Sequence, residues 1–174
     1  QGSKIINDTI LVALVELLKI YQVIHLCGQA NYEEVKNIID KETKAAAETY
    51  GKDIISGYRL FPFLDGAKLA VAYASSDIII GRAGGMIFEM AALGKPAIIV
   101  PLKNSAAEHQ LANALEFAKY GAIVITEDNF STHILLQQVN AAYQNREVLG
   151  QQIKGFAKPD AAALIARSLL EFIS

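Results

Sequence analysis

Short apolar segments alternate with helical segments along most of the chain, and this alternation limits the possible folds more than any other feature. Between residues 66 and 125 the order is helix, strand, helix, strand, helix, strand. Continuous apolar strands such as 97–100 are typical of a parallel sheet that is covered on both faces. The pattern therefore predicts an α/β fold, in which helices lie on both faces of a Rossmann-like parallel sheet.

The individual elements follow from apolar spacing and from helix-capping residues. Ser3 is a candidate N-cap, and Gly94 and Gly121 stand where helix C-caps favour a left-handed backbone. The expected strands cover 21–27, 58–60, 77–80, 97–100 and 122–125, and the expected helices cover 4–20, 32–50, 66–75, 85–93, 106–120, 131–143, 146–153 and 160–172.

The start of the chain is unusual for this fold class. A doubly wound nucleotide-binding domain normally has a strand that leads into its first glycine-bearing turn. Here a helical pattern follows Gln1-Gly2-Ser3 directly. We therefore expect a single domain, residues 1–174, of a longer protein, with the first strand outside this chain. The alternative is that Gln1-Gly2-Ser3 remains from a cleaved tag.

Composition excludes several functional classes. The net charge is −2 and the pI is about 5.9, so no overall charge favours binding to nucleic acid. Cys27 is the single cysteine, which rules out an internal disulfide. No apolar run approaches the roughly 18 residues of a membrane span, and no signal peptide is visible. These features predict a cytoplasmic location.

The loop that follows strand 77–80 is the first candidate ligand site, because ligands of open parallel sheets bind at the carboxyl ends of the strands. It reads Gly81-Arg82-Ala83-Gly84-Gly85. Glycines let the backbone approach a ligand, and the N–H groups of the next helix favour phosphate. A tight turn without a ligand fits equally well, because the loop is neither a dinucleotide fingerprint nor a P-loop.

Further polar or aromatic candidates stand near the other strand ends. Glu89 could accept hydrogen bonds from two ribose hydroxyls, and His109 and Gln110 could bind a sugar. Phe63 and Leu64 could place an aromatic ring and a backbone edge beside a base. Taken singly, each is better explained by a structural role, as surface helix residues for the first three and as a hydrophobic corner for the last two. His25, inside an apolar strand, is interpreted as a core histidine with satisfied hydrogen bonds, and the acidic residues show no metal-binding spacing.

In their order along the chain, these residues resemble the C-terminal domain of the family 28 glycosyltransferases of the MurG type. The segment 77–126 is most specific, and the resemblance spans nearly the whole chain. Gln1-Gly2-Ser3 with Asn7 resembles the end of that family's glycine-rich loop. The strings that carry the resemblance are Gly81-Arg82-Ala83-Gly84, 89–102, His109-Gln110, Asn113-Ala114, His25 with Gly28, and Phe63 with Tyr73-Ala74 and Asp77.

The resemblance implies one half of a GT-B enzyme, with residues 1–174 as the C-terminal UDP-sugar-binding domain. The implied reaction is inverting transfer of N-acetylglucosamine from UDP-N-acetylglucosamine to lipid I, which forms lipid II in peptidoglycan synthesis, with no metal or other cofactor. The N-terminal acceptor domain of the same enzyme would supply the base and bind lipid I, on the inner face of the plasma membrane. This chain alone is therefore expected to be inactive.

Two alternatives remain open at this point. The chain could be the donor-binding subunit of a two-component N-acetylglucosaminyltransferase, or part of a family 28 transferase that uses another lipid acceptor. No nucleic-acid partner is implied under any of these interpretations.

The resemblance also assigns roles to single residues. It implies that Glu89 binds the ribose. The other implied contacts are Gly84, Gly85 and Met86 for the diphosphate, Phe63 and Leu64 for uracil, His109 and Gln110 for the sugar hydroxyls, and Ser3 and Asn7 near the phosphate loop. Independently of the resemblance, Arg82 could add positive charge to the loop of Gly84 and Gly85.

The chain departs from the family pattern at two places. The loop before Glu89 is one residue shorter, and Met86 or Ile87 stands where the family has Thr or Ser. A hydroxyl donor to the diphosphate is therefore missing, or the loop is reshaped. The family also often has Gln-Gln where His109-Gln110 stands.

Overall fold

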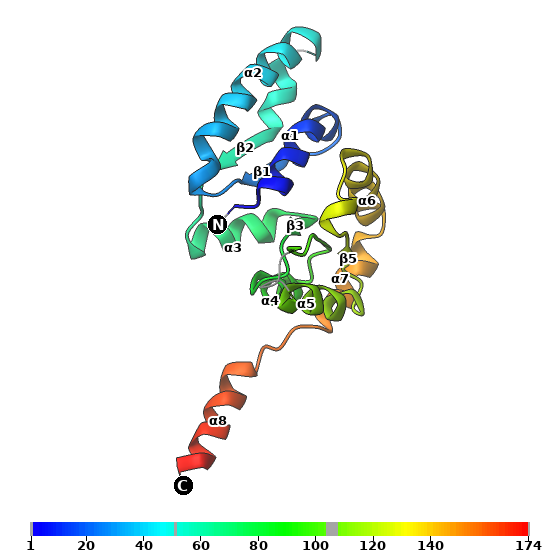
Figure 1. Cartoon of the computed structure of the whole chain (residues 1–174). Coiled ribbons are helices and arrows are strands. Elements are labelled where there is room, and N and C mark those ends of the chain that lie inside the picture. The colour runs from blue at the N-terminus through cyan, green and yellow to red at the C-terminus, as the bar shows by residue number, and fades with distance from the viewer. Residues whose placement is uncertain (1, 51, 104–107, 174) are drawn as a thin grey trace.

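The computed structural model describes residues 2–50, 52–103 and 108–173 (Figure 1). Helices and strands alternate in the predicted order, and the helices over 32–50 and 66–75 have the predicted bounds. The elements are α1 (Lys4–Leu18), β1 (Val23–Leu26), η1 (Gln29–Asn31), α2 (Tyr32–Tyr50), η2 (Lys52–Gly57), β2 (Tyr58–Phe61), α3 (Gly66–Ser75), β3 (Ile79–Gly81), α4 (Met86–Leu93), β4 (Ala97–Ile99), α5 (Glu108–Ala118), β5 (Ile123–Val124), η4 (Glu127–Asn129), α6 (Thr132–Gln144), α7 (Arg146–Lys154) and α8 (Ala161–Ile173).

Local capping residues account for several helix ends. The Ser3 hydroxyl accepts a hydrogen bond from Ile6 N–H at 3.5 Å and caps α1. Gly94 ends α4 with φ +61°, and Gly121 follows α5 with φ +94°. Both glycines adopt the left-handed backbone that was predicted for them.

The strands form two parallel sheets, whereas the sequence predicted one. β1 pairs with β2, and a second sheet has the order β3-β4-β5. A doubly wound fold has six strands in the spatial order 3-2-1-4-5-6. In that order, β2 and β1 take the places of strands 3 and 2, and β3, β4 and β5 take the places of strands 4, 5 and 6. The place of the first strand lies between β1 and β3, and none of the described strands occupies it.

Helix α1 packs toward both sheets and links them. Its residues Ile10, Ala13 and Leu17 join a buried cluster with Ile98 of β4 and with α6. On the side toward α2 and β2, Leu14 contacts a separate cluster that contains Cys27, Val35, Ile39 and Tyr58. Burying each such aliphatic side chain contributes about 1.5–3 kcal/mol. The two faces of α1 therefore hold the two sheets in one domain.

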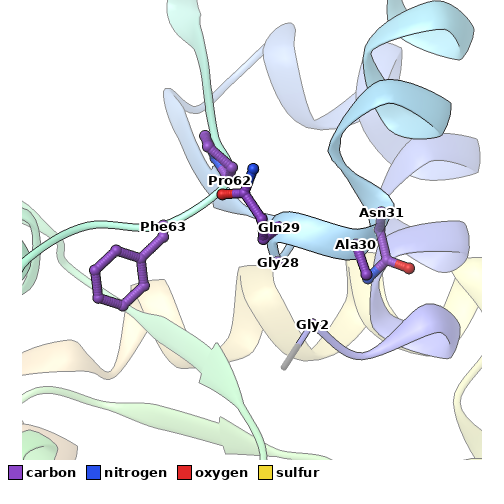
Figure 2. Close-up of a pocket in the computed structure, with 7 residues that line it drawn as sticks. All are labelled: Gly2, Gly28, Gln29, Ala30, Asn31, Pro62 and Phe63. Carbon is purple, nitrogen blue, oxygen red and sulfur yellow. The ribbon is translucent and has the colours of Figure 1, made fainter.

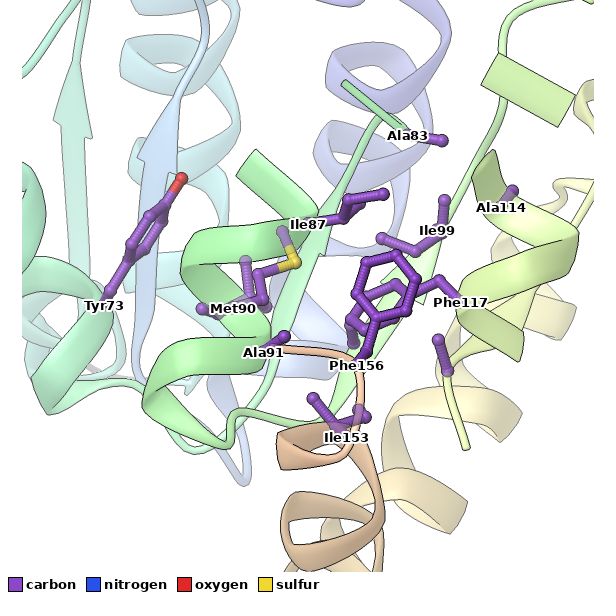
Figure 3. Close-up of a cluster of buried hydrophobic side chains, with 13 residues drawn as sticks. Tyr73, Ala83, Ile87, Met90, Ala91, Ile99, Ala114, Phe117, Ile153 and Phe156 are labelled. Atoms are coloured by element: carbon purple, nitrogen blue, oxygen red, sulfur yellow. The ribbon is translucent and has the colours of Figure 1, made fainter. Parts of the chain in front are cut away.

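The largest apolar core lies between the second sheet and the helices α4, α5 and α7 (Figure 3). Ile87, Met90, Ile99, Phe117 and Ile153 are completely buried there. Phe156, which follows α7, packs against Phe117 with ring centroids 4.9 Å apart. This core fixes α4 against the sheet and so sets the direction of its N-terminus.

Helix α8 extends away from the rest of the chain (Figure 1). Its large apolar side chains are between 57% and 90% exposed, and they are Leu164, Ile165, Leu169, Leu170 and Phe172. Among the described residues, no helix is long and apolar enough to cross a membrane.

Candidate functional site

The candidate residues form two groups at the carboxyl ends of the strands. The first group surrounds the ends of β1 and β2 and the start of α1. The second follows β3 and β4 and includes the first turns of α4 and α5. Ligands of doubly wound folds bind at this edge, so both groups lie where the sequence predicted a site.

A pocket of about 590 Å³ lies in the first group (Figure 2). This volume falls in the range of roughly 300–1,000 Å³ that is usual for small-molecule sites. Phe63 lines the pocket and is 71% exposed, whereas Leu64 is buried. The lining residues are Gly2, Gly28, Gln29, Ala30, Asn31, Pro62 and Phe63.

Sequence reasoning missed Gln29, Ala30 and Asn31 as part of this pocket. The signal that could have found them is Gly28, which follows β1 and has φ +88°. A left-handed glycine directly after a parallel strand turns the following residues across the sheet edge.

Behind the pocket lies a buried set of polar side chains from α1, β1 and β2. Asn7 Nδ2 donates to the Cys27 carbonyl at 2.9 Å, and Asn7 Oδ1 lies 3.0 Å from His25 Nε2. His25 Nδ1 lies 2.8 Å from the Tyr58 hydroxyl. The interpretation of His25 as a core histidine with satisfied hydrogen bonds is confirmed.

Burial changes the acid–base behaviour of this set. It lowers the pKa of His25 from 6.5 to about 4, so the ring is neutral at pH 7. Burial also raises the pKa of the Tyr58 phenol, which therefore keeps its proton. The set thus contains no charged side chain at neutral pH.

Asn7 and Ser3, both predicted near a phosphate loop, have internal partners for their side chains. Asn7 is only 3% exposed, and both ends of its amide are hydrogen bonded within the protein. The Ser3 hydroxyl caps α1. The structure therefore brings both residues to the first group, and it gives each a defined structural role there.

The N-terminus of α4 carries the second group's candidate anion site. Ile87 N–H and Phe88 N–H bond to the carbonyls of Gly84 and Gly85 at 3.2 Å. Within the described residues, the N–H groups of Gly85 and Met86 have no backbone acceptor. Free N–H groups at a helix N-terminus favour an anion. Among the described residues, a Cβ placed on Gly84 or Gly85 would meet no atom within 4 Å, so the space beside this turn is open on their side.

Arg82 contacts neighbouring protein groups on the side of β4 and η4. Its guanidinium lies 2.6 Å from Glu127 Oε1 and donates to the Val100 carbonyl at 2.9 Å. The two charged side chains are only 20% and 17% exposed. Asn113 of α5 donates to the Ala83 carbonyl at 3.3 Å and holds the same loop from the other side. Glu127 was not found from the sequence, because its partner lies far away along the chain.

Glu89 lies in the first turn of α4 and is exposed. Within the described part of the chain, its carboxylate has no hydrogen-bond or ion-pair partner. Burial raises the pKa of Tyr73, and the nearby Glu89 charge raises it further. The carboxylate is thus available to an external ligand.

His109 and Gln110 lie in the first turn of α5. His109 is exposed, and Gln110 Oε1 accepts a hydrogen bond from Leu102 N–H at 3.3 Å. Lys103 in the same loop pairs with Asp128 at 2.6 Å. Residues 104–107, where the sequence predicted the start of this helix, lie outside the described residues.

The His, Cys, Asp and Glu side chains of the described residues were compared for a possible metal centre. Across residues 2–50, 52–103 and 108–173, no three His, Cys, Asp or Glu residues come together in a way that could hold a metal ion.

Parallel strands flanked by helices, with open helix N-termini at the strand ends, define the class of doubly wound nucleotide-binding domains. The family model of the glycosyltransferase family 28 C-terminal domain matches residues 1–167. The chain therefore belongs to this family.

Two curated relatives and one solved structure agree with this assignment. The chain is 34% identical over 173 residues to a UDP-N-acetylglucosamine--N-acetylmuramyl-(pentapeptide) pyrophosphoryl-undecaprenol N-acetylglucosamine transferase 2 of Bacillus cereus, covering 98% of this chain and 44% of that protein. A transferase of the same name without the number, from Clostridium tetani, is 38% identical over 149 residues, covering 84% of this chain and 37% of that protein. The crystal structure of Acinetobacter baumannii MurG superposes with a TM-score of 0.76 at 25% identity, covering 98% of this chain and 47% of that chain.

These comparisons confirm the expected fold, a Rossmann-like half of a GT-B glycosyltransferase. The chain spans less than half the length of the relatives it matches.

Proposed function

We propose that residues 1–174 are the C-terminal donor-binding domain of an enzyme that transfers N-acetylglucosamine from UDP-N-acetylglucosamine to lipid I. The observation that carries the proposal is the first turn of α4. There, N–H groups without a backbone acceptor adjoin open space, and the exposed Glu89 follows in the same turn. A diphosphate next to a ribose requires an anion site beside a hydrogen-bond acceptor. The names of the relatives supply the sugar and the acceptor.

The roles of single residues follow from their positions. In this proposal the N–H groups of Gly85 and Met86, beside Gly84, bind the diphosphate, and Glu89 accepts hydrogen bonds from the ribose. Backbone N–H groups and a helix dipole can stabilise a leaving diphosphate without a metal. Binding should therefore be unchanged by EDTA.

Uracil is assigned to the pocket beside Phe63, and the sugar to His109 and Gln110. Phe63 is exposed at the pocket wall, where its ring can contact a base. Leu64 is buried, so only its backbone is offered to the ligand. His109 is exposed in the first turn of α5, which begins after the β4 loop.

The exposed apolar face of α8 supports the acceptor domain as a partner. Five large apolar side chains on one short helix favour a covering protein surface over water. The relatives contain more than twice the length of this chain, which leaves room for a second domain. In this proposal α8 packs on that domain, which binds lipid I at the inner face of the plasma membrane and supplies the catalytic base. The present chain alone would then bind the donor without turnover.

Calorimetric titration with UDP-N-acetylglucosamine tests the donor site. Replacing Glu89 with Ala should weaken binding about tenfold or more, because hydrogen bonds to a charged group contribute roughly 1.5–3 kcal/mol. Glu147→Ala is the matched control, because Glu147 is also an exposed acid in the first turn of a helix. Its affinity should equal that of the unsubstituted chain.

Two results would defeat parts of the proposal. If the folded chain does not bind UDP-N-acetylglucosamine, the donor-site assignment is wrong. If UDP-galactose binds with equal affinity, the specificity for N-acetylglucosamine is wrong.

A further inference from the structure

The Cys27 carbonyl, at the end of β1, accepts hydrogen bonds from two side-chain amides. Asn7 Nδ2 reaches it from α1 at 2.9 Å, and Asn31 Nδ2 reaches it from η1 at 2.8 Å. Two donors on one carbonyl fix the orientation of the peptide between Cys27 and Gly28. That peptide enters the turn that lines the pocket.

The Asn7 amide is held between the Cys27 carbonyl and the His25 ring. Since Asn7 Nδ2 donates to Cys27, Asn7 Oδ1 faces His25 Nε2 at 3.0 Å and must accept its proton. The neutral ring then has an unprotonated Nδ1, which accepts the Tyr58 hydroxyl proton at 2.8 Å. A single tautomer of His25 therefore satisfies all three side chains.

The network has only one low-energy arrangement. Asn7, His25 and Tyr58 are 3%, 6% and 7% exposed, so water cannot replace a lost partner. Among the described residues, no buried side-chain N or O atom lacks a hydrogen bond. A buried polar group without a partner is costly, which makes a satisfied buried network rigid.

The wall that this network supports is made of backbone. A Cβ on Gly2 would overlap the Cys27 carbonyl, and a Cβ on Gly28 would overlap the Gly2 backbone. Gly2 and Gly28 thus touch without side chains that could lock them together. Both line the pocket (Figure 2). Their relative position depends on what holds Cys27 and α1, namely Asn7 and His25.

We propose that His25 and Asn7 are positioning residues for donor binding, which act through the Cys27 carbonyl to hold Gly2 and Gly28 at the wall that contacts the UDP part of the donor. This inference rests on the proposed function for the choice of ligand. It differs from a ligand role, because neither side chain reaches the pocket surface.

Two substitutions of His25 separate positioning from mere packing. His25→Leu replaces the ring with an apolar side chain of similar size, which removes both hydrogen bonds. His25→Gln can still donate to Asn7 and accept from Tyr58 through its amide. Calorimetric titration with UDP, on protein shown by circular dichroism to be folded, should give about tenfold weaker binding for His25→Leu, with most of the affinity retained in His25→Gln. Ile153→Val, in the apolar core of the second sheet, is the control for general loss of stability. It should bind UDP as the unsubstituted chain does.

Amide spectra of the ligand-free chain provide a readout that does not need the ligand. His25→Leu should displace the ¹H–¹⁵N signals of Gly2, Gly28 and Asn31, and Ile153→Val should leave them in place. Unchanged signals for these residues in His25→Leu, or equal UDP affinity of folded His25→Leu and the unsubstituted chain, would overturn the positioning role. If the unsubstituted chain does not bind UDP at all, the proposed function fails, and the amide signals alone decide whether the network sets the turn.

Discussion

The two sheets of this domain end in candidate site residues, but different forces hold those residues in place. The first sheet, with α1 and η1, relies on a buried hydrogen-bond network around Asn7 and His25. The second relies on a mainly apolar core under α4, beside the largely buried ion pair Arg82–Glu127. Apolar packing is non-directional and tolerates small shifts, whereas a buried network specifies one geometry. Stability should therefore depend mainly on the second sheet, and pocket geometry mainly on the first.

Removing a core ring should produce the largest loss of stability. Phe117→Ala in the second sheet's core is expected to lower the free energy of unfolding by about 3–5 kcal/mol, because it leaves a cavity where a completely buried ring packs against Phe156. Urea unfolding measures the change. The control Val148→Ala removes a side chain that is 59% exposed and should change stability by less than about 0.5 kcal/mol. A loss below about 1 kcal/mol for Phe117→Ala would contradict the assignment of the main core.

Acid should weaken the first sheet specifically. The pKa of His25 is lowered on folding from 6.5 to about 4. The unfolded chain therefore binds a proton that the folded chain excludes, and the contribution of neutral His25 is complete above pH 6.5 and is lost as the pH falls toward 4. The expected loss over this range is about 3 kcal/mol.

Urea unfolding between pH 7 and pH 4 measures this loss. In His25→Gln, the slope of the unfolding free energy against pH should be smaller. His133 lies in the first turn of α6, outside the network, so His133→Gln should keep the slope of the unsubstituted chain. An identical slope in His25→Gln would assign the acid sensitivity to other groups.

Substitutions of two neighbouring acids, Glu127 and Asp128, should give the smallest changes in unfolding free energy and form the most closely matched pair. Glu127 pairs with Arg82 where both side chains are at most 20% exposed, while Asp128 pairs with Lys103 where both are more than 60% exposed. Glu127→Gln should cost about 1–2 kcal/mol of unfolding free energy, because it leaves the half-buried Arg82 without its charged partner. Asp128→Asn should cost less than about 1 kcal/mol, as usual for exposed pairs. Equal losses in urea unfolding would show that burial does not distinguish the two pairs.

The candidate site was only partly predictable from the sequence. The loop of Gly84 and Gly85 and the exposed Phe63 could be named as candidates, because glycines and aromatics shortly after strands are local signals, and their ligand contacts remain predictions. Asn31 and Glu127 were missed, since each matters through a partner that is brought close only by folding. The residue roles assigned to Glu89, His109 and Gln110 remain predictions for the binding experiments.

Most helices and strands could be predicted from neighbouring residues alone. Apolar spacing set the helices and strands, Ser3 capped α1, and Gly94 ended α4 with the left-handed backbone that a residue without a Cβ adopts easily.

The division of the strands into two sheets and the buried contact between Asn7 and His25 could not be predicted in this way. Strand pairing and buried hydrogen bonds join residues distant in the sequence, and their geometry is selected by packing of the whole domain. For the same reason, His25 could be interpreted from the sequence as a satisfied core residue, while its partners and its tautomer could not.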